Sequence, residues 1–115
     1  MNIFSWNINK KYVVNPSEIA KEIQLGKAVL LDVRTKEELD DEGYAENATH
    51  FNITRMENGE LPNISKEIKV YIYCRSGGRA ERVKNILLDN GFANVINIGG
   101  LSDWIKCGGK VINNL

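Results

Sequence analysis

Apolar residues follow two different spacings along this chain, one typical of buried strands and one typical of helices. Residues 28–33 and 69–73 are nearly continuous apolar runs, which predict strands buried on both faces. Residues 94–98 predict a further strand. Between the last two runs, apolar side chains recur every three or four positions, and this spacing predicts a helix from about 78 to 90. The helical positions are Ala80, Val83, Ile86 and Leu87.

Capping residues mark the starts of two more helices. Asn15 precedes Pro16 and lies three residues before Glu18, which is a helix N-terminus pattern. Thr35 and Glu38 form a second capping-box pattern ahead of an apolar residue. The remaining segments are predicted as short strands at 11–14 and 49–53, an irregular stretch at 54–67 and a helical turn at 101–105.

The alternation of strands and helices predicts an α/β fold with three layers, in which helices cover both faces of a mainly parallel central sheet. A chain of 115 residues has apolar content for one core, so we predict one domain over residues 1–115. Ligands of parallel sheets bind outside the carboxyl ends of the strands. Cys74 directly follows the predicted strand at 69–73, which places it at such an end.

The segment that begins at Cys74 carries the strongest chemical signal. A turn containing two glycines can aim several backbone N–H groups at the sulfur, and the helix that follows favours negative charge there. Nearby guanidinium groups favour the thiolate as well. We therefore predict that Cys74 is the catalytic nucleophile. The predicted substrate-binding residues are Arg75, Ser76, Gly77, Gly78 and Arg79.

Each loop residue has a specific expected role. Gly77 and Gly78 supply the φ values of a tight turn and let a substrate approach the backbone. Arg75 and Arg79 face an anion or brace the loop. One of them could instead form an internal ion pair, for example with Asp32 or Glu38.

Other reactive residues carry weaker signals. His50 is the single histidine, and we predict a strand-end residue rather than a general base. Cys107 is predicted to be a spectator, and Trp104 a core residue. The chain lacks paired metal-ligand spacing, which predicts no metal site.

Charge and the N-terminal segment bear on partners and compartment. The chain has 15 Lys plus Arg and 15 Asp plus Glu without a basic stripe, so nucleic acid is not an expected partner. No apolar run approaches the roughly 20 residues that span a bilayer, and a membrane is not expected either. Residues 1–7 lack a signal-peptide pattern, and the two cysteines lie far apart, which predicts a cytoplasmic protein with reduced thiols.

Four segments in order resemble the rhodanese-like sulfurtransferase domain. They are Leu31-Asp32-Val33-Arg34 with Glu37-Glu38, residues 43–51, the loop 74–80, and Gly99-Gly100 with Trp104. Two departures are local. Tyr44, Ala45 and Asn47 replace the family's usual His, Ile and Gly, and Ala80 replaces a hydroxyl residue often found after the second loop arginine.

The resemblance implies that sulfane sulfur moves from thiosulfate or a similar small anionic donor to cyanide, a small thiol or a protein thiol. It implies a Cys74 persulfide as the intermediate and no cofactor. Four residues separate Cys74 from Arg79, one fewer than in tyrosine phosphatases, and arsenate reductases of similar fold also use a longer loop. Two alternatives stay open: a rhodanese-like recognition module without turnover, and a thiol redox protein in which Cys74 pairs with Cys107.

Overall fold

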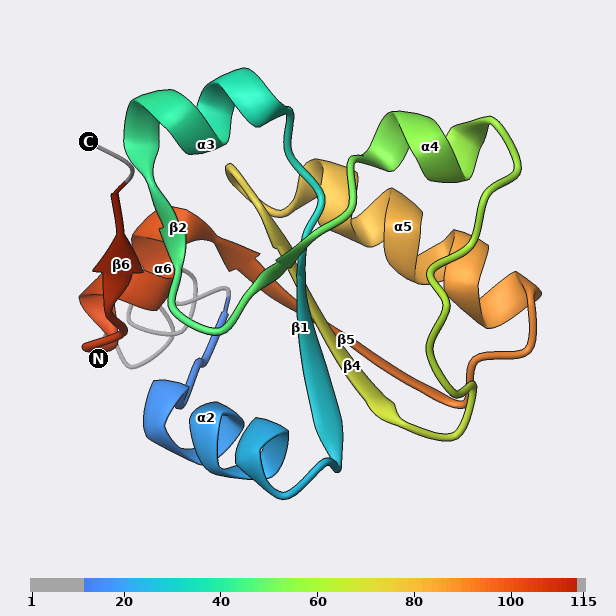
Figure 1. Cartoon of the computed structure of the whole chain (residues 1–115), viewed down its shortest axis with the longest axis horizontal. Helices are drawn as coiled ribbons and strands as arrows, with labels where there is room; N and C mark the ends of the chain where they lie inside the picture. The colour runs from blue at the N-terminus through green and yellow to red at the C-terminus, as the bar shows by residue number, and fades with distance from the viewer. Residues whose placement is uncertain (1–11, 114–115) are drawn as a thin grey trace, which may run out of the picture.

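Four parallel strands form the central sheet, in the order β3-β1-β4-β5. The computed structural model describes residues 12–113. The strands are β1 (Ala28–Asp32), β3 (Thr49–His50), β4 (Lys69–Cys74) and β5 (Asn94–Gly100). Their carboxyl ends meet at one edge of the sheet, at the top of Figure 1.

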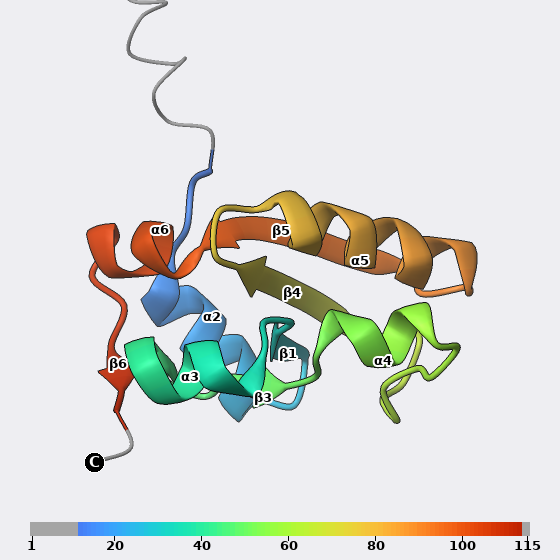
Figure 2. The same cartoon turned by 90° about the horizontal axis from the view of Figure 1, so that it is seen from above.

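Helices cover both faces of this sheet (Figures 1 and 2). Helices α4 (Ile53–Glu57) and α5 (Gly78–Asp89) lie on one face, and α2 (Pro16–Gln24) and α6 (Leu101–Lys106) lie on the other. Helix α3 (Lys36–Glu42) lies beyond the carboxyl edge. The predicted sheet between two helical layers is therefore confirmed.

Side chains of β4 alternate between the two cores, as the period of a strand requires. Val70, Ile72 and Cys74 belong to the core beneath α4 and α5. Tyr71 and Tyr73 belong to the core beneath α2 and α6. The alternation fixes the face on which Cys74 lies, and α5 begins on that same face.

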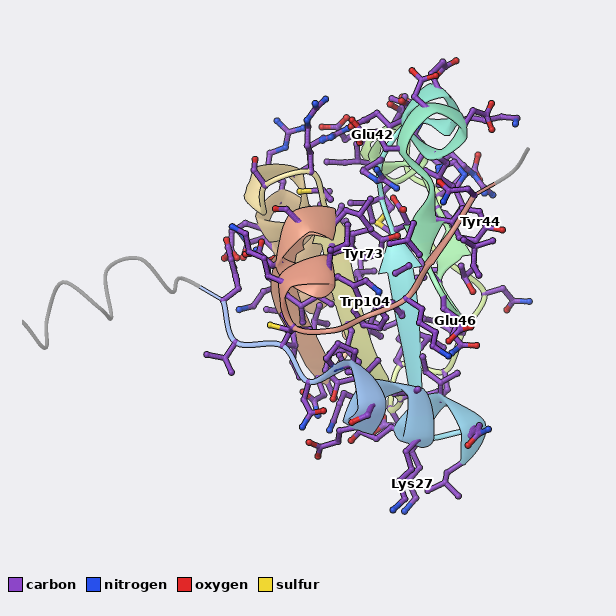
Figure 3. All side chains as sticks on the ribbon, turned by 90° about the vertical axis from the view of Figure 1, so that its left-hand side faces the viewer. Lys27, Glu42, Tyr44, Glu46, Tyr73 and Trp104 are labelled. Atoms are coloured by element: carbon purple, nitrogen blue, oxygen red, sulfur yellow. The ribbon has the colours of Figure 1, made fainter. Side chains whose placement is uncertain are left out.

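The predicted helix caps are present. Asn15 accepts a hydrogen bond from the Glu18 N–H, and Thr35 and Glu38 form a reciprocal capping box. Trp104 is buried in the core, as predicted, and its indole N–H donates to the carbonyl of Lys110 at 2.8 Å. Figure 3 shows Trp104 and Tyr73 in the interior of the molecule.

Two predicted strands differ from the structure. Residues 12–14 are irregular, and Lys11 lies outside the described residues. Val14 is buried but Val13 is 87% exposed, so one side chain anchors this segment without a strand. The strand predicted at 49–53 ends at His50, because Asn52 caps a new helix by accepting from the Thr54 N–H.

Two other elements were not predicted. Helix α4 occupies the start of the stretch expected to be irregular, where Ile53 and Met56 pack into the core one turn apart. Strands β2 (Tyr44–Ala45) and β6 (Val111–Ile112) pair antiparallel in a second, two-stranded sheet. Each strand has only two residues, too few for a period to be visible.

Within residues 12–113, no helix combines the length and apolar character needed to cross a membrane.

Candidate active site

Cys74 ends β4, and its sulfur lies in a cradle of backbone N–H groups. The N–H of Gly77 donates to Cys74 Sγ at 3.0 Å, and the N–H of Ala80 donates at 3.4 Å. Ala80 belongs to the first turn of the twelve-residue helix α5, whose N-terminus favours negative charge. Cys74 is 1% exposed. These groups stabilise an anion on the sulfur.

The two loop glycines serve different purposes. Gly77 has a φ of +102°, and a Cβ there would lie 2.3 Å from the Tyr12 hydroxyl, so the turn and its packing both require glycine. Gly78 begins α5 with ordinary helical backbone, and the prediction of an unusual φ is wrong for this residue. A Cβ at Gly78 would meet nothing within 4 Å. Gly78 therefore leaves open space beside the helix start.

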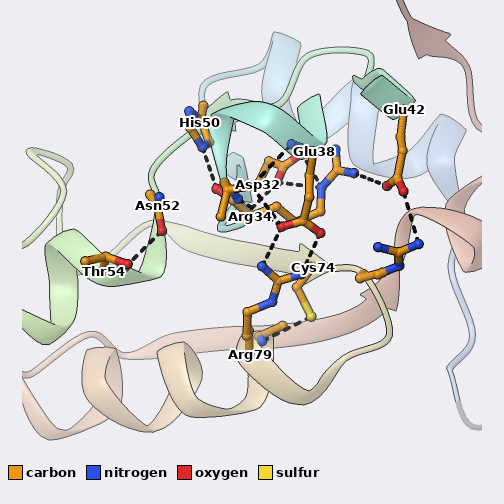
Figure 4. A network of polar contacts seen from close by, with 12 residues as sticks. Asp32, Arg34, Glu38, Glu42, His50, Asn52, Thr54, Cys74 and Arg79 are labelled. Atoms are coloured by element: carbon orange, nitrogen blue, oxygen red, sulfur yellow. Dashed lines mark hydrogen bonds and ion pairs between the residues drawn. The ribbon is translucent and has the colours of Figure 1, made fainter. Parts of the chain in front are cut away.

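Arg79 makes the internal ion pair that the sequence suggested for one arginine. Its two terminal nitrogens donate to the two carboxylate oxygens of Glu38 at 2.7 and 2.8 Å (Figure 4). The Arg79 hydrogen bonds lower the pKa of Glu38 to about 2. Glu38 in turn raises the pKa of Arg79. Arg79 thus joins α5 to α3 across the site.

Arg75 is the arginine that remains available to a ligand. Its side chain is 67% exposed, and a terminal nitrogen lies 3.3 Å from Glu42 Oε2. Ser76 beside it is also exposed. A hollow of about 340 Å³ adjoins Arg75, and its lining residues are Glu42, Arg75, Leu101, Ser102 and Ile105.

A buried polar cluster supports this edge of the sheet (Figure 4). Arg34 is fully buried and donates to both oxygens of Asp32, to Glu42 and to the carbonyl of Gly43. Tyr73 also donates to Asp32, and burial, followed by the Asp32 charge, raises the pKa of its phenol. Burial lowers the pKa of Arg34, but the hydrogen bond and charge of Asp32 outweigh it and raise the pKa. The cluster ties α3 to β1 and β4.

Two residues of β5, Gly100 and Asn97, contact the loop that follows Cys74. Gly100 pairs with Cys74, and a Cβ on Gly100 would lie 1.8 Å from the Arg75 carbonyl oxygen. The side-chain amide of Asn97 donates to the Gly77 carbonyl at 3.0 Å. Neither residue was predicted to support the site. The double glycine ahead of the last helix was the available signal for Gly100.

The fold and the cradle agree with one protein family. The model of the rhodanese-like domain matches residues 15–107 of this chain. The chain belongs to this family. The match includes the loop, the buried Arg34 cluster and the supporting glycines.

One curated protein and several solved structures are similar to this rhodanese-like domain. A tRNA uridine(34) hydroxylase from Staphylococcus carnosus (strain TM300) is 32% identical over 104 residues, which cover 84% of this chain and 32% of the relative. The chain therefore spans about a third of that curated relative's length.

Solved structures share the fold. The Alr3790 protein from Anabaena sp. has a TM-score of 0.73 and 21% identity over 89% of this chain and 81% of that one. A human single-domain sulfurtransferase, TSTD1, has a TM-score of 0.67 and 20% identity, with coverage of 82% and 95%. A rhodanese with anions from E. coli has a TM-score of 0.62 and 23% identity, with coverage of 76% and 99%.

Two residues of this rhodanese-like domain lie apart from the cradle. His50 Nε2 is 2.6 Å from the Arg34 carbonyl oxygen, which agrees with the predicted strand-end role. Cys107 is an exposed free thiol at the C-terminal end of α6, whereas Cys74 pairs with Gly100 at the other end. Among residues 12–113, no group of three or more His, Cys, Asp or Glu side chains could hold a metal ion.

Proposed function

We propose that this rhodanese-like domain is a sulfurtransferase that carries sulfane sulfur as a persulfide on Cys74. The observation that carries the proposal is the pair of N–H groups of Gly77 and Ala80 aimed at Sγ. Such donors stabilise negative charge without rearrangement when it develops. A persulfide is an anion of this kind.

In the first step the Cys74 thiolate attacks the outer sulfur of thiosulfate or a similar anionic donor. A bond forms between Sγ and that sulfur, and the bond from that sulfur to the sulfonate sulfur breaks. Sulfite leaves with the bonding electrons, so charge is conserved. The persulfide remains on Cys74, next to the N-terminus of α5, which favours its negative charge.

In the second step an acceptor anion, such as cyanide or a thiolate, attacks the outer sulfur of the persulfide. The bond to Sγ breaks, and its electrons return to Cys74 as thiolate. Cyanide leaves as thiocyanate. This chemistry involves only the chain's own residues and the two substrates, and we propose that it takes place in the cytoplasm.

The two arginines have separate roles in this proposal. Arg75 is exposed beside the hollow and attracts the anionic donor. Arg79 is held by Glu38 and acts on the loop rather than on the donor. The Arg79 side chain lies on the same side of the site as Cys74 (Figure 4).

Intact-mass measurement tests the persulfide directly. Thiosulfate treatment should add about 32 Da, the mass of one sulfur atom, to the wild-type chain. Cys74→Ser should abolish the added mass, and Cys107→Ser, the matched control, should retain it. A gain that persists in Cys74→Ser would exclude Cys74 as the carrier.

The tRNA uridine(34) hydroxylase relative supports a second candidate, in which the domain serves RNA modification. The balanced charge of 15 basic and 15 acidic residues gives little basis for binding a polyanion. Titration with tRNA at low and moderate salt distinguishes the candidates. Saturable binding that persists at moderate salt would favour the RNA role.

The other two alternatives are tested by turnover and by mapping of thiols. A recognition module would give no thiocyanate from any sulfane donor together with tight partner binding. A redox protein would link Cys74 to Cys107 under mild oxidant. In the structure helix α6 lies between Gly100, the strand partner of Cys74, and Cys107.

A further inference from the structure

Glu42 contacts two arginines at once, one inside the molecule and one at its surface. Its Oε1 accepts from Arg34 at 3.1 Å, and its Oε2 lies 3.3 Å from Arg75. Arg34 is fully buried and fixed by Asp32 and by the Gly43 carbonyl. The carboxylate of Glu42 is therefore held at the rim of the site by a rigid support (Figure 4).

The hollow beside the active-site loop contains this pair. Glu42 and Arg75 supply its charged part, and Leu101, Ser102 and Ile105 of α6 supply the rest. The hollow lies beside the sulfur's loop, because Arg75 follows Cys74 and Leu101 follows Gly100, which pairs with Cys74. Arg75 and Glu42 form an ion pair in the lining of this hollow.

We propose that Glu42 is a specificity-determining residue that discriminates between sulfur donors by their charge. A donor anion that binds Arg75 must compete with Glu42 Oε2 for the guanidinium and approach the carboxylate. The repulsion from Glu42 is about twice as large for a dianion such as thiosulfate as for a monoanion at the same position. A monoanion with an apolar body can also contact Leu101 and Ile105. This inference rests on the proposed sulfur transfer.

The charge of Glu42 and its support of Arg34 can be separated. Glu42→Gln keeps a side-chain oxygen that can accept from buried Arg34, and it removes only the negative charge. Glu42→Asp keeps the charge on a shorter side chain and serves as the conservative rescue. Glu57→Gln is the matched control, because Glu57 forms an exposed ion pair with Arg82 at 3.4 Å on other elements.

The measurement is the second-order rate constant of persulfide formation, taken from single-turnover mass spectrometry with two donors. Thiosulfate is the dianionic probe, and benzenethiosulfonate is the monoanionic probe. The latter transfers its outer sulfur to the Cys74 thiolate and releases benzenesulfinate, so atoms and charge balance. The ratio of the two rate constants reports charge selectivity and is independent of the amount of folded protein.

Glu42→Gln should raise the ratio of thiosulfate to benzenethiosulfonate roughly fivefold, the scale expected for removing one charge near a solvent-exposed site. The rise should shrink at high salt. Glu42→Asp and Glu57→Gln should keep the wild-type ratio. In an Arg75→Gln background the effect of Glu42→Gln should fall to less than half.

An unchanged or lowered ratio in Glu42→Gln would overturn the inference while leaving sulfur transfer intact. If Glu42→Gln raised the ratio as much in the Arg75→Gln background as in the wild-type background, competition for Arg75 would be overturned as the cause. Wild-type protein that forms no persulfide with either donor would instead refute the proposed function. The two failures are therefore distinguishable.

Discussion

At the scale of single residues, the two loop arginines differ in their exposure and in how they pair with carboxylates. Arg75 is exposed and meets Glu42 through one contact at 3.3 Å, an arrangement that contributes little to stability. Arg79 is three-quarters buried and pairs with Glu38 through two hydrogen bonds. Equivalent substitutions at the two positions should therefore affect different quantities.

Arg75→Ala should raise the KM for thiosulfate about tenfold and change the free energy of unfolding by less than about 0.5 kcal/mol. Arg79→Ala should lower the free energy of unfolding by about 1–2 kcal/mol, because it leaves the Glu38 carboxylate half-buried without its partner. Urea denaturation and thiocyanate kinetics on both variants check this. A larger stability loss in Arg75→Ala than in Arg79→Ala would contradict the assignment.

The sequence predicted the residues of the loop but not their partners. Cys74 through Arg79 are contiguous, so one strand end and one helix start were enough to place them. Glu38 was only one of two suggested partners, and Glu42 was not suggested at all. Those carboxylates precede their arginines by more than thirty residues. Their pairing depends on how α3 lies over the carboxyl edge, which local patterns do not specify.

At the scale of elements, the contact between β5 and the loop positions the cradle. Gly100 has extended backbone with a φ of −119°, so its requirement for glycine is steric and not conformational. Its missing Cβ is what lets the Arg75 carbonyl approach. The turn that aims the Gly77 N–H at the sulfur begins at this carbonyl.

Gly100→Ala should displace the loop, lower the rate of persulfide formation at least tenfold and cost about 1–3 kcal/mol of stability. Gly78→Ala is the matched control for stability, because its Cβ meets open space at ordinary helical φ and alanine favours helices. Its free energy of unfolding should stay unchanged or rise. Thermal denaturation and intact mass measure both effects, and a Gly100→Ala protein as stable and reactive as wild type would refute the steric role.

The elements that the sequence missed are those whose stability comes from distant contacts. The long apolar runs and the caps at Asn15 and Thr35 were sufficient for the main strands and helices. Strands β2 and β6 exist because Ala45 is buried and its N–H donates to the Tyr73 hydroxyl at 2.9 Å, a contact over 28 positions. Such a contact is visible only once the sheet has brought Tyr73 beside this segment.

At the scale of the whole molecule, ion pairs join the helix over the sheet edge to the loop and the core. Glu38 of α3 pairs with Arg79 of α5, and Glu42 of α3 meets buried Arg34. Helix α3 has seven residues and buries only Leu39 among its side chains. Its attachment therefore depends on charge, and it should respond to pH.

The Glu38 carboxyl has a pKa of about 2 in the folded protein, against an ordinary value of 4.5. Between these values the unfolded chain binds a proton that the folded chain does not, so the free energy of unfolding falls as pH falls. The stabilisation is fully present above about pH 4.5 and is lost as pH falls through about 2. It amounts to something on the order of 2 kcal/mol.

Glu38→Gln removes this contribution, so the variant should be less stable than wild type near neutral pH and the difference should shrink as the pH approaches 2. Urea denaturation at a series of pH values measures the two curves. Glu57→Gln, which alters an exposed pair, should run parallel to wild type over the same range. If the Glu38→Gln curve also runs parallel to wild type, α3 is held by its apolar contact and capping rather than by Arg79. If the curves converge, the ion pair that fixes Arg79 beside Cys74 also attaches α3 to the edge of the sheet.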